Sequence, residues 1–117
     1  MYYKELEVWK EARRLVKEVY KLTSEFPKSE LFGLTSQINR SVISIPSNIA
    51  EGCARYSDKD TNKFIDIALG SAAELDTQLI IAQDLGFAVY DKNLISLVNK
   101  VTALLQDLKK YINTSGT

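Results

Sequence analysis

The spacing of the apolar residues constrains the fold of this chain more than any other feature. In four stretches, apolar side chains recur at alternating intervals of four and three residues. Such intervals keep them on one face of an α-helix, which turns once in about 3.6 residues. We therefore predict an all-α protein whose helices span approximately residues 5–25, 29–55, 58–85 and 91–112.

Local sequence signals agree with these limits. Phe26-Pro27 closes the first stretch, because a residue that precedes proline disfavours helical geometry. Ser57 can cap the third helix, Gly86 can end it, and Asp91 can cap the fourth. Pro46 lies inside the second stretch, but the apolar pattern keeps its phase across it. We therefore expect one helix that is kinked near Pro46 rather than two separate helices.

The four helices are predicted to form a single domain that spans residues 1–117. Their connections are too short for a crossover, which favours an antiparallel up-down-up-down four-helix bundle. Leu31 and Leu34 are expected to extend the apolar face of the second helix toward its start. The charged N-terminus does not resemble a signal peptide, and no apolar stretch is long enough to cross a membrane, so we expect a cytoplasmic protein without membrane contact.

The composition excludes most kinds of enzyme. The chain has no histidine, which removes histidine general acids and bases, histidine metal ligands and the common catalytic triads. Cys53 is the single cysteine, and we expect it to be a buried structural thiol. No glycine-rich phosphate loop is present. We therefore expect no catalytic residue, no metal site, no cofactor and no small-molecule substrate.

The charges sum to zero, with 15 basic and 15 acidic residues, but they are unevenly distributed. Residues 1–24 carry a net charge of +2 and residues 57–86 a net charge of −4. In the first helix, basic residues at intervals of four, three and four form a stripe that can follow a phosphate backbone or can simply face water. With three further arginines, the candidate nucleic-acid-binding residues are Lys10, Arg13, Arg14, Lys17, Lys21, Arg40 and Arg55.

A polar seam runs along one side of the second helix, and it is rich in Ser, Asn and Gln, which are poor helix formers. It is either a solvated face, in which Glu51 pairs with Arg55, or a hydrogen-bonded contact, with Glu74 as a partner for Arg40. A small-residue patch at residues 70–73 serves either packing within the fold or a subunit contact. The candidate contact residues are Gln37, Arg40, Ser44, Asn48, Glu51, Arg55, Gly70, Ser71 and Glu74.

Several motifs are those of a known family. They are Glu5-Leu6-Glu7-Val8-Trp9-Lys10, Glu30-Leu31-Phe32-Gly33-Leu34 and, most specifically, Ser44-Ile45-Pro46-Ser47-Asn48-Ile49-Ala50-Glu51-Gly52. Over nearly its whole length the chain resembles the four helix bundle protein family, whose members are encoded by intervening sequences in bacterial 23S ribosomal RNA genes.

The resemblance implies an antiparallel four-helix bundle that assembles as a barrel-shaped homopentamer and has no catalytic activity. It also links the chain to the accessory protein of diversity-generating retroelements, which contacts a reverse transcriptase and nucleic acid. Two hypotheses follow. The first is an oligomeric protein that binds RNA or a ribonucleoprotein, and the second is a protein–protein adaptor without affinity for nucleic acid.

Overall fold

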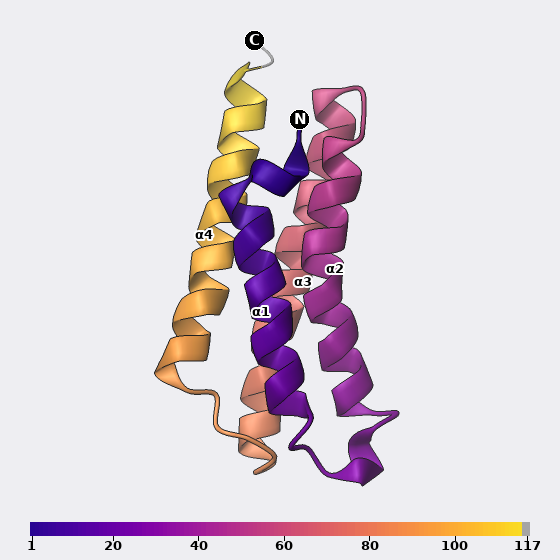
Figure 1. The fold of residues 1–117 in the computed structure, drawn as a ribbon, viewed down its shortest axis with the longest axis vertical. Helices are drawn as coiled ribbons and strands as arrows, with labels where there is room; N and C mark the ends of the chain where they lie inside the picture. Colours follow the sequence, from indigo (N-terminus) through magenta and orange to yellow (C-terminus); the bar gives the residue numbers. More distant parts are fainter. Residues whose placement is uncertain (116–117) are drawn as a thin grey trace.

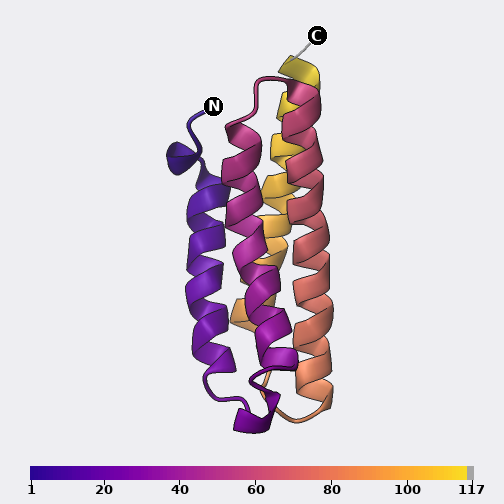
Figure 2. The same cartoon turned by 90° about the vertical axis from the view of Figure 1, so that its right-hand side faces the viewer.

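The computed structural model describes residues 1–115 as four α-helices and two short 3₁₀ turns. The helices are α1 (Glu7–Thr23), α2 (Leu34–Cys53), α3 (Asp58–Asp84) and α4 (Lys92–Ser115), and the turns are η1 (Tyr3–Glu5) and η2 (Lys28–Glu30). Successive helices run in opposite directions and form an elongated bundle (Figures 1 and 2). Both α1 and α3 pack against α2 and α4, so α1 and α3 lie diagonally opposite each other.

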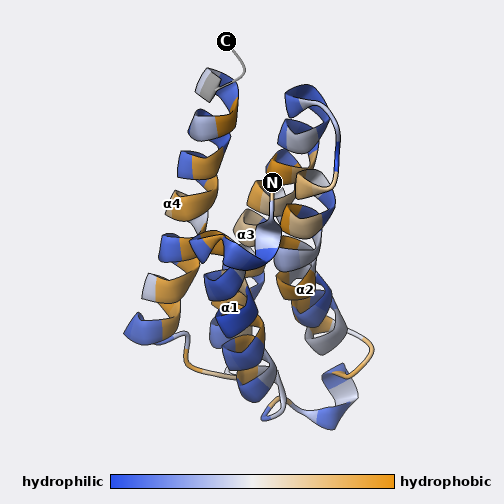
Figure 3. Cartoon of the chain, turned by 45° about the horizontal axis from the view of Figure 1, so that its top comes forward, coloured by the Kyte–Doolittle hydropathy of each residue, from blue (hydrophilic) through white to orange (hydrophobic). Residues whose placement is uncertain are grey.

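The residues of the four-three pattern form one core that runs along the bundle axis. On α4, the side chains from Leu94 to Ile112 that keep the interval are all buried, as the sequence predicted. Figure 3 shows the same segregation, with hydrophobic residues turned inward and a largely hydrophilic outer side on α1. None of the helices described is long and apolar enough to cross a membrane.

The predicted caps are present. The Ser57 hydroxyl accepts a hydrogen bond from the Asp60 amide at 3.2 Å, and an Asp91 carboxylate oxygen accepts one from the Leu94 amide at 2.9 Å. Gly86 has a φ of +77°, which a residue with a Cβ adopts only with strain. There the Phe87 amide donates to the Ala82 carbonyl at 2.9 Å, which satisfies an open carbonyl at the end of α3.

Helix limits differ from the prediction mainly at the start of α2. We expected this helix to begin near residue 29, but η2 comes first and α2 begins only at Leu34. Gly33 adopts non-helical angles of φ −107° and ψ −115°, which separates the two elements. As a result Leu31 is 55% exposed, so the prediction that it continues the core face was wrong. Leu34, in contrast, packs against the core.

Smaller differences occur at the other ends. α1 is two residues shorter at each end than predicted, and α4 continues to Ser115, while residues 116–117 of the predicted polar tail lie outside the described part. α2 is continuous through Pro46, as the apolar phase predicted, and a local kink there stays a prediction.

The end of α2 lies very close to the start of α3. The Thr61 hydroxyl donates to the Gly52 carbonyl at 2.8 Å. A Cβ built on Gly52 would lie 3.0 Å from the Phe64 Cβ and 3.1 Å from the Thr61 carbonyl oxygen, so only glycine fits this crossing. Cys53 is buried beside it, as predicted, and burial raises the pKa of its thiol.

Candidate functional site

The five predicted cations of α1 form an exposed surface, which we call the α1 basic face. The core side of α1 is occupied by residues such as Ala12, Leu15 and Val19, which are completely buried. The cations lie on the other side of the helix and all five are exposed to solvent. The members of the α1 basic face are Lys10, Arg13, Arg14, Lys17 and Lys21.

The acidic residues of α1 lie on the side that borders α4. Lys100 of α4 approaches Glu7 at 3.7 Å and Glu11 at 3.6 Å, and the Glu11 side chain is only 18% exposed. Arg14 also contacts Glu11, at 3.4 Å.

The remaining cations of the face differ in how they are held. Lys21 pairs with Glu18 at 3.7 Å, and the Arg13 guanidinium lies 4.9 Å from the centre of the Trp9 ring. Within residues 1–115, neither Lys10 nor Lys17 forms an ion pair. These two lysines therefore remain available to an anionic partner.

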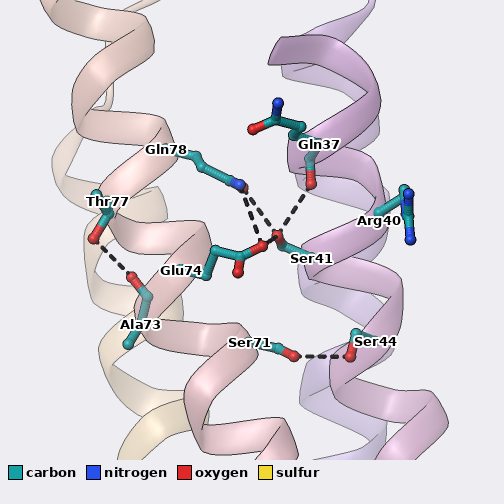
Figure 4. Close-up of a pocket in the computed structure, with 9 residues that line it drawn as sticks. All are labelled: Gln37, Arg40, Ser41, Ser44, Ser71, Ala73, Glu74, Thr77 and Gln78. Atoms are coloured by element: carbon teal, nitrogen blue, oxygen red, sulfur yellow. Dashed lines mark hydrogen bonds between the residues drawn. The ribbon is translucent and has the colours of Figure 1, made fainter. Parts of the chain in front are cut away.

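The polar seam forms one side-chain hydrogen bond between α2 and α3, at Ser44 (Figure 4), whereas Gln37, Arg40, Glu51 and Arg55 are exposed. The hydroxyls of Ser44 and Ser71 lie 2.8 Å apart, and the Asn48 amide donates to the Ser44 carbonyl at 2.8 Å. Next to them the Ser41 hydroxyl lies 2.7 Å from a carboxylate oxygen of Glu74. Hydrogen bonding therefore accounts for two residues of the seam, Ser44 through its contact with α3 and Asn48 through its bond to Ser44 within α2.

Sequence reasoning missed two members of this network, Ser41 and Gln78. The four-three interval places Gln78 on the apolar face of α3, but its side-chain amide lies 3.3 Å from Glu74 and its carbonyl lies 3.0 Å from the Ser41 hydroxyl. A glutamine at a core position was the signal that could have located the network. Both residues are buried.

The predicted pairing of Arg40 with Glu74 is not formed. Figure 4 shows the Arg40 side chain turned away from Glu74, whose partners are Ser41 and Gln78. Among the described residues, Arg40 has no ion pair. Gln37, at the end of the seam, contributes its backbone carbonyl, which lies 3.0 Å from the Ser41 hydroxyl.

Arg55 and Glu51 form the predicted pair, at 3.0 Å, and the Arg55 guanidinium lies 4.6 Å from the centre of the Phe64 ring. Since Phe64 belongs to α3, the structure places Arg55 toward α3 and does not join it to the α1 basic face. Both charges of the pair remain largely exposed.

One part of the small-residue patch of α3 packs within the fold, and another part is exposed; the subunit contact stays a prediction. Ala72 is buried in the core and Ser71 bonds to α2, whereas a Cβ on Gly70 would meet nothing within 4 Å. Ile67 and Ile81, three and eleven residues from Gly70, are also exposed. The outer side of α3 therefore combines an open glycine with two exposed isoleucines.

A groove that the sequence did not reveal lies between α1 and α2, near the connection that joins them. It is lined by Tyr20 of α1 and by Phe32, Arg40 and Ile43 from the following segment. The available signal is the apolar pair Leu31-Phe32 directly before Gly33, of which only Leu31 was predicted to lie on the core face. No group of three or more Cys, Asp or Glu side chains within residues 1–115 is arranged to hold a metal ion.

A comparison with family models identifies the chain. The model described as 23S rRNA-intervening sequence protein matches residues 4–110. The chain belongs to this family. No individual curated protein matches it significantly. The match to the 23S rRNA-intervening sequence protein family includes the whole α1 basic face and the whole polar seam.

Proposed function

We propose that this member of the family is a non-enzymatic, homo-oligomeric protein that binds structured RNA through the α1 basic face. The observation that carries the proposal is the arrangement of α1, whose five cations are exposed on one side of the helix and two of which, Lys10 and Lys17, have no ion pair within the described residues. A row of cations on one helix matches the spaced charges of a phosphate backbone. The family's association with 23S rRNA supports RNA as the nucleic acid.

The chemistry of the chain supports a binding role rather than catalysis. Without histidine, a general acid or base for neutral pH would have to come from a strongly shifted side chain. The Cys53 thiol is buried and its pKa is raised, so it is not an activated nucleophile.

An RNA-binding titration over a range of salt concentrations tests the proposal. The variant Lys10→Ala/Lys17→Ala removes the two lysines without an ion pair, and Lys59→Ala/Lys63→Ala removes two exposed lysines from α3 as a matched control. Each lost phosphate contact lowers the slope of log K against log salt by about 0.7–0.9. We expect the magnitude of the slope of log K against log salt to fall by about 1.5 in Lys10→Ala/Lys17→Ala and to stay unchanged in Lys59→Ala/Lys63→Ala. Absence of binding by the unaltered protein at low salt would contradict the proposal.

The homo-oligomer is proposed to form through α3 and the adjoining side of α2. Only Arg40 and Glu51 are charged among the 20 residues of α2, whereas eight of the 17 residues of α1 are charged. Depletion of charge is typical of the centre of protein interfaces. The exposed isoleucines of α3 and the open Gly70 lie beside this surface.

Native mass measurement tests the assembly. Ile67→Asp is expected to give a folded monomer, because the side chain is exposed in the protomer and an unpaired carboxylate in an interface is costly. Ile95→Asp places the same charge at an exposed position of α4 and is the matched control. A protein that assembles but does not bind RNA would favour the alternative function, a protein–protein adaptor.

A further inference from the structure

The groove between α1 and α2 displays aromatic side chains that the fold does not bury. We call it the aromatic groove and use six of its lining residues: Tyr20, Phe32, Ser36, Arg40, Ile43 and Ser47. The Phe32 side chain is 94% exposed, and Tyr20 and Ile43 are 41% and 43% exposed. A nearly fully exposed phenylalanine beside two further apolar side chains is a common feature of binding surfaces.

Phe32 is carried by a tightly bonded turn. The Gly33 amide donates to the Glu30 carbonyl at 3.0 Å, and the Leu31 amide donates to the Lys28 carbonyl at 3.1 Å. Hydrogen bonds therefore hold the backbone on both sides of Phe32. Because this backbone is already ordered, ligand stacking on Phe32 does not require the turn to lose conformational freedom.

The residues that line the aromatic groove carry a positive charge. Arg40 is charged and has no ion pair within the described residues, and none of the described lining residues is Asp or Glu. On α1, Arg13 and Lys17 precede Tyr20 by seven and three residues, and this spacing places them on the same side of the helix. The α1 basic face therefore leads along α1 to the edge of the groove.

From this combination we infer that the aromatic groove binds unpaired nucleotides of single-stranded RNA. The bases stack on Phe32 and Tyr20, and Arg40 and Lys17 contact the neighbouring phosphates. The inference rests on the RNA binding proposed above and specifies which part of an RNA the protein selects.

The chemistry of the lining residues favours single-stranded RNA over other ligands of the groove. Every base has a flat face that stacks on an aromatic ring, and the hydroxyls of Ser36 and Ser47 can bond to base edges or to ribose. An RNA duplex keeps its bases stacked inside the helix, so it contacts the α1 basic face but leaves the groove empty. An acidic, apolar peptide is the competing occupant.

Binding of two RNA probes by Phe32→Ala tests the inference. The probes are a short oligouridylate and a blunt RNA duplex with the same number of nucleotides per strand, measured by fluorescence anisotropy at low salt. Loss of one stacking contact is expected to weaken oligouridylate binding roughly 5- to 100-fold and to leave duplex binding unchanged. Tyr56→Ala removes another fully exposed aromatic side chain, from the connection at the opposite end of the bundle, and is the matched control (Figure 1).

The outcomes separate this inference from the proposed function. If Phe32→Ala binds both probes as the unaltered protein does, while Lys10→Ala/Lys17→Ala binds both less well, the groove inference is wrong and the basic-face proposal stands. If the unaltered protein binds neither probe, both are wrong. If Phe32→Ala changes the native mass but not RNA binding, the groove receives a second copy of the chain, which also overturns the inference.

Ultraviolet crosslinking supplies a second measurement, which reports where the RNA lies on the protein. A crosslink from oligouridylate to the peptide that contains Phe32 or Tyr20 is expected. Crosslinks confined to the peptides of α3 and α4 would contradict the inference.

Discussion

The Ser41 hydroxyl of α2 lies 2.7 Å from the Glu74 carboxylate of α3, and this contact lies between two helices that pack closely along their length. The Gln37 carbonyl and the Gln78 side-chain carbonyl are each 3.0 Å from the same hydroxyl. The three acceptors compete for one hydroxyl hydrogen, and a charged acceptor gives the stronger bond. Ser41 therefore bonds mainly to Glu74.

Substitution of Ser41 measures this contact. Ser41→Ala is expected to lower the free energy of unfolding by about 1 kcal/mol, less than for a fully buried charged hydrogen bond, because water can replace the lost donor at the exposed Glu74. Urea denaturation of Ser41→Ala, Glu74→Ala and the double variant gives the coupling between the residues. Ser47→Ala, an exposed serine of the same helix, is the control, and equal losses in both serine variants would contradict the contact.

Gly52 is expected to tolerate no side chain. In Gly52→Ala the new Cβ would lie 3.1 Å from a backbone oxygen of Thr61, which cannot move aside without shifting α3. Overpacking of this kind costs about 1–3 kcal/mol, and the expected result is a corresponding fall in the urea midpoint. An unchanged urea midpoint would mean that α2 and α3 pack less tightly at Gly52 than they do in the structure.

The core and the caps could be predicted because their signals are local. A four-three interval fixes which side of a helix is apolar whatever the neighbouring helices do, and Ser57 and Asp91 bond to amides three residues away. The same reasoning failed at Leu31. The apolar interval extends back to Leu31, but Gly33, which lies between Leu31 and α2, has non-helical backbone angles, so Leu31 is not part of the helix.

The partners across the seam could not be predicted, because they depend on how far each helix is rotated about its axis. Arg40 and Ser41 are adjacent in sequence and differ by about 100° around α2. That rotation decides which of them faces Glu74, and it is set by the packing of the whole bundle. The aromatic groove was missed for a related reason, since Tyr20 and Phe32 belong to different segments and line one groove only in the folded chain.

Gly70→Ala is expected to have opposite effects on the protomer and on the assembly. A glycine inside a helix costs about 0.5–1 kcal/mol relative to alanine, and here the added methyl group meets no atom within 4 Å. The protomer should therefore become more stable in urea at low protein concentration. If a second copy packs against Gly70, the methyl group should also weaken the oligomer, which native mass spectrometry over a concentration series would detect. A more stable protomer with unchanged assembly would place the subunit contact elsewhere.

Tyr90 is expected to make the stability of the fold depend on pH under alkaline conditions. Its hydroxyl donates to an Asp76 carboxylate oxygen at 2.7 Å, and the side chain is 6% exposed. Burial raises the pKa of Tyr90 above its usual value, and the hydrogen bond and the negative charge of Asp76 raise it further. The folded protein therefore keeps the phenolic proton at a pH where the unfolded chain releases it.

The sign of the effect follows from this difference in bound protons. The contribution of Tyr90 is fully present below the unfolded pKa of about 10, and above that pH it falls by about 1.4 kcal/mol per pH unit. Tyr90→Phe cannot titrate, so the difference in unfolding free energy between the unaltered protein and this variant should shrink as the pH rises past 10. Tyr111→Phe, at an exposed tyrosine of α4, should show no such trend. A difference that stays constant into that alkaline range would mean that the Tyr90 hydroxyl is not held by Asp76.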